Sequence, residues 1–155
     1  MGVPNYFQTI IDNYPDVLLP KLSNVAILCF DFNGIVHWAA GKIASEMKYQ
    51  AKHQDAYENA ILREIDKRVE QLYNLTKPYM RICFYVDGSA VKAKMKQQLQ
   101  RRTKGPIEHD MKESIREQLG EELEGIIYNK NAITPGTPFM TKLNGHLLKL
   151  ADKYP

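Results

Sequence analysis

Cysteine, tryptophan and long apolar runs are all scarce in this sequence. Cys29 and Cys83 are its two cysteines, and each stands inside an apolar run, so we expect buried free thiols of an intracellular protein rather than a disulfide or a metal pair. None of the four histidines stands beside a cysteine at zinc-finger spacing, which argues against a structural zinc site. No apolar stretch approaches the roughly 18 residues of a membrane span, so we expect no membrane partner.

A strong excess of either charge is also absent. The net charge of +3 and the isoelectric point near 8.8 are mildly basic, which is weak evidence for a nucleic-acid partner. Hydrophobic residues make up 44% of the chain and charged residues 25%, a balance typical of soluble globular proteins. The length of 155 residues predicts one domain over residues 1–155.

Two apolar runs that each end in an aspartate are the main structural signal. Residues 25–30 end at Asp31, and residues 82–86 end at Asp87. The first run has the length and the bulky residues of a strand buried on both faces. Apolar residues at helical spacing over 57–72 predict a helix between the two strands. We therefore expect an α/β fold, a twisted and mostly parallel sheet flanked by helices, with a right-handed crossover.

Further helices are predicted on both sides of this unit. Apolar residues between 7 and 14 recur at helical spacing. Asp55 and Glu58 form a plausible capping box for the central helix, whereas residues 41–54 show no clear pattern. Thr137 suits the N-cap of a last helix, with Pro138 at its first position. The buried stripe of that helix is expected to be Phe139, Leu143, Leu147 and Leu150.

Asp31 and Asp87 are the first candidate site residues. Open parallel sheets bind ligands outside the carboxyl ends of their strands, which is where both aspartates are expected. Two converging carboxylates repel each other unless a proton or a cation lies between them, and Mg²⁺ prefers oxygen ligands of this kind. The alternative is that each aspartate simply caps the helix that follows it.

A basic helix is predicted directly after Asp87. It runs from about Ser89 to Arg102, and Gly105-Pro106 is expected to end it. Residues 108–124, with seven acids and two bases, are expected to form a solvated and partly helical segment.

The basic helix is the second candidate for function. Residues 92–102 carry five positive charges and no negative one, and Lys94, Gln98 and Arg101 share one helical face. Guanidinium, ammonium and amide donors suit a phosphate group. The alternative is a solvated basic face without a ligand.

His37 is the third candidate, on the connection six residues beyond Asp31. A loop histidine there could stack on a base or titrate near neutral pH, although an ordinary surface or packed histidine is the alternative. A haloacid-dehalogenase phosphatase is disfavoured, because its chemistry needs a second aspartate where this chain has Asn33.

Four segments in order resemble the N-terminal conserved region of the Xrn-type 5′→3′ exoribonucleases. They are Met1-Gly2-Val3-Pro4 with Tyr6-Phe7, Asp31-Phe32-Asn33-Gly34-Ile35-Val36-His37, Val86-Asp87-Gly88 with Ala93-Lys94-Met95, Gln97-Gln98 and Arg101-Arg102, and Ile133-Thr134-Pro135-Gly136-Thr137 with Phe139-Met140. The resemblance implies a nuclease core of the PIN and flap-endonuclease type, of which this chain is a part. It also implies that Asp31 and Asp87 ligate catalytic Mg²⁺ (or Mn²⁺).

The resemblance further implies an RNA partner with a 5′-monophosphate, from which nucleotides are removed one at a time. His37 would stack against the 5′-terminal base. The residues implied to grip the 5′-phosphate are Lys94, Gln98, Arg101 and Arg102.

Departures from the family pattern limit what the chain is expected to do. Val91-Lys92 replaces the Pro-Arg that often precedes Ala-Lys-Met in the family, and the family's later acidic motifs are absent. We therefore expect the N-terminal portion of a catalytic domain that is inactive by itself and that could self-associate through an exposed sheet edge. A non-catalytic module that binds RNA 5′ ends, or a fragment of a flap-type DNA nuclease, is the alternative.

Overall fold

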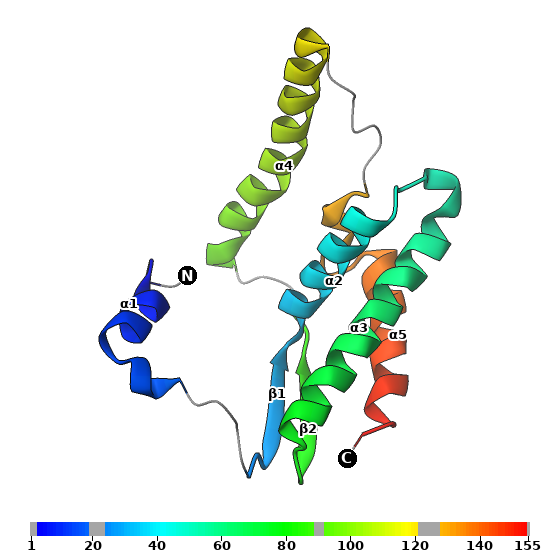
Figure 1. Ribbon diagram of the computed structural model, residues 1–155. Helices are drawn as coiled ribbons and strands as arrows, with labels where there is room; N and C mark the ends of the chain where they lie inside the picture. Colours follow the sequence, from blue (N-terminus) through cyan, green and yellow to red (C-terminus); the bar gives the residue numbers. More distant parts are fainter. Residues whose placement is uncertain (1–2, 19–23, 89–91, 121–127, 155) are drawn as a thin grey trace.

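The computed structural model describes residues 3–18, 24–88, 92–120 and 128–154, which form a mixed α/β structure (Figure 1). The helices and strands are α1 (Tyr6–Asn13), β1 (Ile27–Asp31), α2 (Phe32–Glu46), α3 (Gln54–Thr76), β2 (Arg81–Tyr85), α4 (Lys92–Leu119) and α5 (Pro138–Ala151). Between them, the described ranges contain three short 3-10 helices, η1 (Pro15–Val17), η2 (Ala51–His53) and η3 (Lys130–Ala132). Within the described ranges, no helix is long and apolar enough to cross a membrane.

The sheet consists of β1 and β2, which pair in parallel. Leu28 pairs with Ile82 and Phe30 with Phe84, so the two apolar runs lie in register. Parallel strands need a crossover connection, and α2 and α3 supply it. The predicted parallel α/β arrangement is confirmed, while the finer expectation of a PIN-type core stays a prediction.

The apolar residues on one face of this sheet share a core with α2, α3 and α5, and α3 lies beside both other helices (Figure 1). Phe30, Phe32 and Phe84 form an aromatic cluster at the sheet, with ring centroids 5.1 to 6.4 Å apart. The largest fully buried side chains are Phe32, Val36, Tyr57, Ile61, Ile65, Val69, Phe139 and Leu143. The predicted buried stripe of α5 is confirmed, because all four of its residues belong to this core.

The other face of the sheet is open, which corrects two expectations. Ile27, Cys29 and Asp31 of β1 are exposed, so this strand is not buried on both faces. Cys29 is exposed and Cys83 is half-buried. The thiols are therefore free, as expected, but the expectation that both are buried is wrong. An apolar run reveals a strand, but it does not reveal whether a second layer covers that strand.

Helix α2 is an element that the sequence pattern did not predict. Its buried side faces the core through Val36, Ala39, Ala40 and Ile43. Two glycines, three alanines and a weak apolar periodicity hide this helix in the sequence. The helix places His37 on a rigid element instead of the expected loop.

Ion pairs at buried carboxylates link the helices. Glu64 of α3 is buried and binds Lys42 of α2, with Lys67 at 3.4 Å. The hydrogen bond from Lys42 is the main reason why the pKa of Glu64 lies below its usual value. Glu58 is also buried, and it accepts a hydrogen bond from Gln54 at 2.8 Å. Lys142 of α5 lies 3.3 Å from Glu58, and this ion pair joins α5 to α3.

The predicted capping box of α3 does not form. His53 occupies the N-cap position without a side-chain cap, and Glu58 turns inward to Lys142. The attraction between Glu58 and the Lys142 ammonium of α5 outweighs the hydrogen bond that Glu58 would make in a capping box. By contrast, Thr137 caps α5 as predicted, accepting a hydrogen bond from the Met140 amide at 3.4 Å, and Pro138 opens the helix.

Helices α1 and α4 lie away from the core (Figure 1). Helix α1 forms as predicted, yet none of its residues is buried. Helix α4 continues through Pro106 to Leu119, so the expectation that Gly105-Pro106 ends the helix is wrong. Pro106 cannot donate to the Arg102 carbonyl, but this helix extends away from the core, where water can satisfy such a group.

Replacing Leu143, fully buried in α5, should destabilise the fold. Leu143→Ala removes apolar contacts and leaves a cavity, so the free energy of unfolding should fall by about 2–5 kcal/mol. The matched control is Leu148→Ala, because Leu148 lies on the same helix and is 65% exposed, and it should change stability by less than about 0.5 kcal/mol. Chemical denaturation measures both, and equal effects would contradict the described packing of α5.

Candidate functional site

Asp31 and Asp87 lie at the same edge of the sheet. Asp31 is the last residue of β1 and pairs with Tyr85, the last residue of β2. Asp87 follows two residues beyond Tyr85, and both aspartates are exposed. The parallel ladder thus brings the two motif aspartates to neighbouring strand ends, as the sequence predicts. Their chemical role stays a prediction.

A hydrogen bond from Asp87 to Asn33 ties the two motif segments together. The Asp87 backbone N–H donates to the Asn33 side-chain oxygen at 3.1 Å, across 54 positions of sequence. Asn33 lies in the first turn of α2, so this bond holds the end of β2 against the start of that helix. In the sequence, Asn33 argues against a phosphatase and belongs to the first aspartate motif, but neither signal reveals this positioning role.

The alternative that Asp31 simply caps the following helix is not supported by the hydrogen bonds of its side chain. Asp31 occupies the N-cap position of α2, but its carboxylate makes no side-chain cap hydrogen bond. The exposed carboxylate can therefore turn to a ligand at the sheet edge. For Asp87 this alternative stays open, since residues 89–91 lie outside the described structure.

The two carboxylates fit a small hard cation only in part. Mg²⁺ binds through one or two carboxylates and keeps several waters, so Asp31 and Asp87 suit one such ion. Over the described ranges, however, no group of three or more His, Cys, Asp and Glu side chains is placed to hold a metal. If the residues hold a cation, they do so as a shallow site that needs oxygen atoms from elsewhere.

The four predicted phosphate-binding residues all lie on α4. Their side chains, those of Lys94, Gln98, Arg101 and Arg102, lie outside what the structure describes. The described basic residues of this segment, Lys92 and Lys96, are exposed. A shared phosphate-binding face therefore stays a prediction, and the predicted start at Ser89 falls on residues that are not described.

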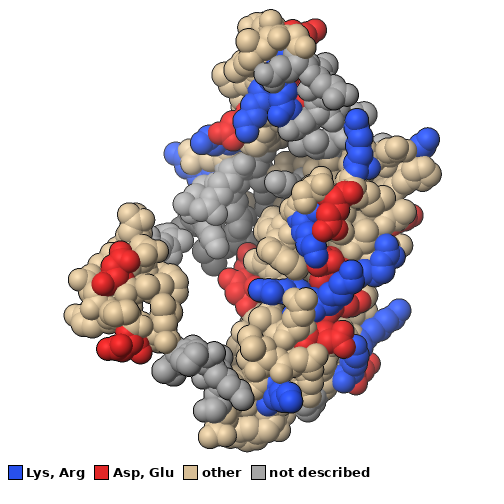
Figure 2. Space-filling model, in the orientation of Figure 1, with Lys and Arg blue, Asp and Glu red and all other residues tan. Residues whose placement is uncertain are grey.

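His37 is exposed on α2, and the next residue, Trp38, is 42% exposed. The Arg68 guanidinium lies 5.1 Å and the Lys42 ammonium 5.7 Å from the centre of the Trp38 ring, a cation–π arrangement. Basic and acidic side chains are interspersed over the body in this view (Figure 2). Trp38 was not among the predicted site residues, although the single tryptophan of the sequence directly follows His37 and could have been selected for that reason.

The Tyr85 hydroxyl lies near both thiols on the open face of the sheet. The electrostatic effect of Cys83, and then that of Cys29, is the main cause that raises the pKa of Tyr85. These three side chains therefore gather beside the strand ends, next to Asp31.

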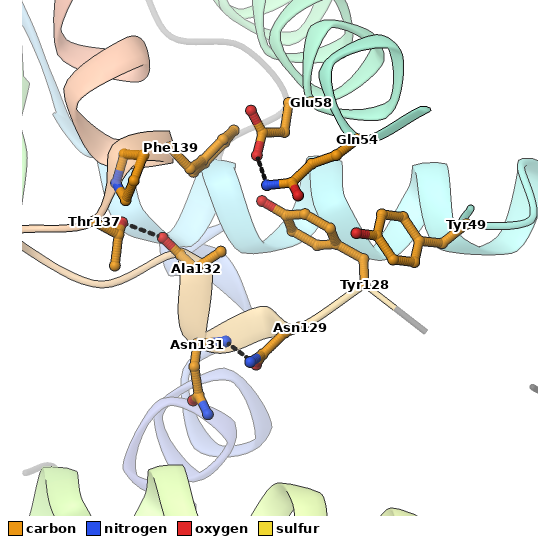
Figure 3. Close-up of a pocket in the computed structure, with 10 residues that line it drawn as sticks. Tyr49, Gln54, Glu58, Tyr128, Asn129, Asn131, Ala132, Thr137 and Phe139 are labelled. Atoms are coloured by element: carbon orange, nitrogen blue, oxygen red, sulfur yellow. Dashed lines mark hydrogen bonds between the residues drawn. The ribbon is translucent and has the colours of Figure 1, made fainter. Parts of the chain in front are cut away.

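A separate pocket of about 360 Å³ lies between α3 and the segment before α5 (Figure 3). Tyr49, Gln54, Glu58 and Tyr128 line one side, and Figure 3 shows Thr137 and Phe139 on another. Burial is the main reason why the pKa of the Tyr128 hydroxyl is raised, and this oxygen has no hydrogen-bond partner among the described residues. None of the predicted site residues lines the pocket.

The fourth motif segment, the signature around Thr137, has a structural role at this pocket. The Thr137 hydroxyl donates to the Ala132 carbonyl or to the Thr134 carbonyl, the latter at 2.9 Å, and so fixes the turn before α5. Phe139 packs against Tyr128, with ring centroids 6.4 Å apart. This signature therefore positions α5 and not the strand-end aspartates.

Comparison with known proteins identifies similar sequences. The family described as "XRN 5'-3' exonuclease N-terminus" matches residues 1–153. The chain is 32% identical to the "5'-3' exoribonuclease 2" of Candida glabrata, over 92% of this chain and 17% of that protein. It is 31% identical to the human "5'-3' exoribonuclease 1", over 95% of this chain and 9% of that protein. The chain thus spans less than a fifth of these curated relatives.

Replacing Asn33 tests whether this side chain positions the Asp87 segment. Asn33→Ala removes the acceptor of the Asp87 N–H, which should cost about 0.5–1.5 kcal/mol and speed hydrogen exchange at Asp87. Asn33→Asp keeps an acceptor oxygen and should preserve slower exchange than the alanine variant. Exchange measured by nuclear magnetic resonance decides the point: an Asp87 amide unaffected by Asn33→Ala would contradict the link.

Proposed function

Because the chain belongs to the XRN 5′-3′ exonuclease N-terminus family, we propose that it supplies part of the active site of a 5′→3′ exoribonuclease. The relatives carry this activity in their names, and the chain corresponds to a small part of each. The single observation that carries the proposal is the placement of Asp31 and Asp87 at neighbouring ends of parallel strands.

In this proposal, Asp31 and Asp87 hold Mg²⁺ or Mn²⁺ at the edge of the sheet. The bound ion would supply an activated water and stabilise charge on the leaving oxygen of the phosphodiester. The contribution of the chain is to fix the two carboxylates: the β1–β2 ladder sets their spacing, and Asn33 restrains the segment that carries Asp87. Both carboxylates are exposed, so a substrate phosphate can approach them.

The basic start of α4 is proposed to bind the 5′-monophosphate of RNA. This helix begins five residues after Asp87, which limits how far its first turn can lie from the strand ends. Five positive charges without a negative one over 92–102 favour an anionic ligand. Lys94, Gln98, Arg101 and Arg102 would contact the phosphate, and His37, exposed on α2, would stack on the 5′-terminal base.

A second candidate is a module that binds RNA 5′ ends without cleaving them. The absence of a third metal-ligating side chain near the aspartates, within the described residues, favours this function for the chain by itself. Cleavage through two metals needs carboxylates for both ions, and two aspartates suffice for one.

Arg101→Ala should separate specific 5′-phosphate binding from general attraction to RNA. In the 155-residue chain with Mg²⁺, this variant should bind 5′-phosphorylated RNA about ten- to a hundredfold more weakly, because a charge-assisted hydrogen bond is lost. Binding of the same RNA with a 5′-hydroxyl should change little. Fluorescence anisotropy measures both affinities, and Lys112→Ala, a change of equal charge later in the same helix, is the matched control.

The same samples distinguish the alternatives. Both candidate functions predict end binding, but we expect the chain alone to leave the RNA intact when the products are separated on a gel. Stepwise degradation that disappears in Asp87→Ala would show that the chain completes its own active site. Equal losses on both RNAs would make α4 a general electrostatic surface, and preference for a DNA end would favour a flap-type nuclease. We also propose that the chain can self-associate through the exposed edges of its two-stranded sheet, so the binding measurements use dilute protein.

A further inference from the structure

Cys29 and Cys83 face each other across the two strands. They are register partners in the β1–β2 ladder, so their side chains project from the same face of the sheet. Neighbouring strands lie about 4.8 Å apart, and a disulfide joins Cα atoms about 4.4–6.8 Å apart. The register therefore places the backbones of the two cysteines within bridging distance before any movement of the chain.

The face that carries the two cysteines is open. Ile27 and Tyr85, which lie on the same face, are 45% and 62% exposed. Cys29 is exposed and Cys83 half-buried, so small molecules can reach the thiols. The core packs on the opposite face through Phe30 and its neighbours, so a bond between the two sulfurs would leave the core undisturbed.

We propose that Cys29 and Cys83 form a reversible redox site that closes to an intrachain disulfide when a peroxide oxidises it. The more exposed Cys29 thiolate attacks one peroxide oxygen, which breaks the O–O bond, gives a sulfenic acid and releases water. The Cys83 thiolate then attacks the Cys29 sulfur and displaces its hydroxyl group as a second water. The two thiols lose two electrons and two protons, and one hydrogen peroxide becomes two waters.

Strand geometry makes this disulfide easy to reduce again. Cβ atoms of a disulfide lie about 3.8 Å apart on average, less than the strand spacing of about 4.8 Å. Because the strand spacing already suits the Cα separation of a disulfide, closing the bond strains the side chains by tilting the two Cβ atoms toward each other, and strained, exposed disulfides are the labile ones. The chain has no other cysteine, so no competing intrachain pair exists. The bond would fix the strands two residues before Asp31 and four before Asp87.

The test oxidises the reduced 155-residue chain with hydrogen peroxide, removes the excess with catalase and blocks remaining thiols with N-ethylmaleimide. Intact mass should show a monomer about two mass units lighter than the reduced chain, without a maleimide adduct. Dithiothreitol should restore two adducts, and peptide mapping should place the bond between Cys29 and Cys83. Two adducts after oxidation, disulfide-linked dimers only, or sulfinic acids only would overturn the proposal.

Two controls show whether the folded sheet promotes the reaction. Equilibration with glutathione redox buffers measures the effective concentration of the Cys29 thiol at the Cys83 thiol. This value should be at least about tenfold higher in the native chain than in the chain unfolded by guanidinium, because the β1–β2 ladder holds the two cysteines together. Equal values in the two conditions would contradict the proposal. Cys29→Ser should leave Cys83 as a single thiol that forms glutathione adducts, and a monomer two mass units lighter in this variant would also contradict it.

Discussion

Parallel pairing between β1 and β2 is the constraint on which the other features depend. A parallel partner cannot be reached by a tight turn, so the chain must leave the carboxyl end of β1, cross the sheet and return before β2. Helices α2 and α3 make that crossing, and their apolar sides, together with α5, bury one face of the sheet. The same geometry brings the carboxyl ends of both strands to one edge. The aspartate pair, the Asn33 bond to Asp87 and the juxtaposed thiols all follow from this ladder.

The sequence predicted those parts of the structure that depend on short-range patterns. Apolar runs ending in Asp31 and Asp87 were sufficient to place two strands and their shared edge, since short runs of bulky and β-branched apolar residues favour strands. Thr137 and Pro138 marked the start of α5 because capping and proline geometry act within one turn. Four motif segments in order indicated the family, and the match over residues 1–153 confirms that identification.

Features that depend on tertiary packing could not be predicted in the same way. Helix α2 is rich in small residues, so its buried side, with Ala39 and Ala40, lacks the contrast that periodicity requires. Cys29 lies in an apolar run, yet its thiol is exposed because no described helix packs on that face of the sheet, which the run itself cannot reveal. Pro106 is tolerated inside α4 because that helix extends away from the core, where water can satisfy the free carbonyl. Glu58 turns to Lys142 because α5 lies within reach of α3.

In the proposed site, Asp31 and Asp87 hold one divalent cation between them, and paramagnetic broadening by Mn²⁺ would reveal such an ion. In nuclear magnetic resonance spectra of the 155-residue chain, the amide signals of Asp31 and Asp87 should broaden together at low Mn²⁺ concentrations. The signal of Asp152, at the far end of α5, should not broaden in that range. Because a shared ion needs both ligands, Asp31→Asn should shift the broadening at Asp87 to higher Mn²⁺ concentrations. Broadening at Asp87 that is unchanged in Asp31→Asn would contradict a shared site.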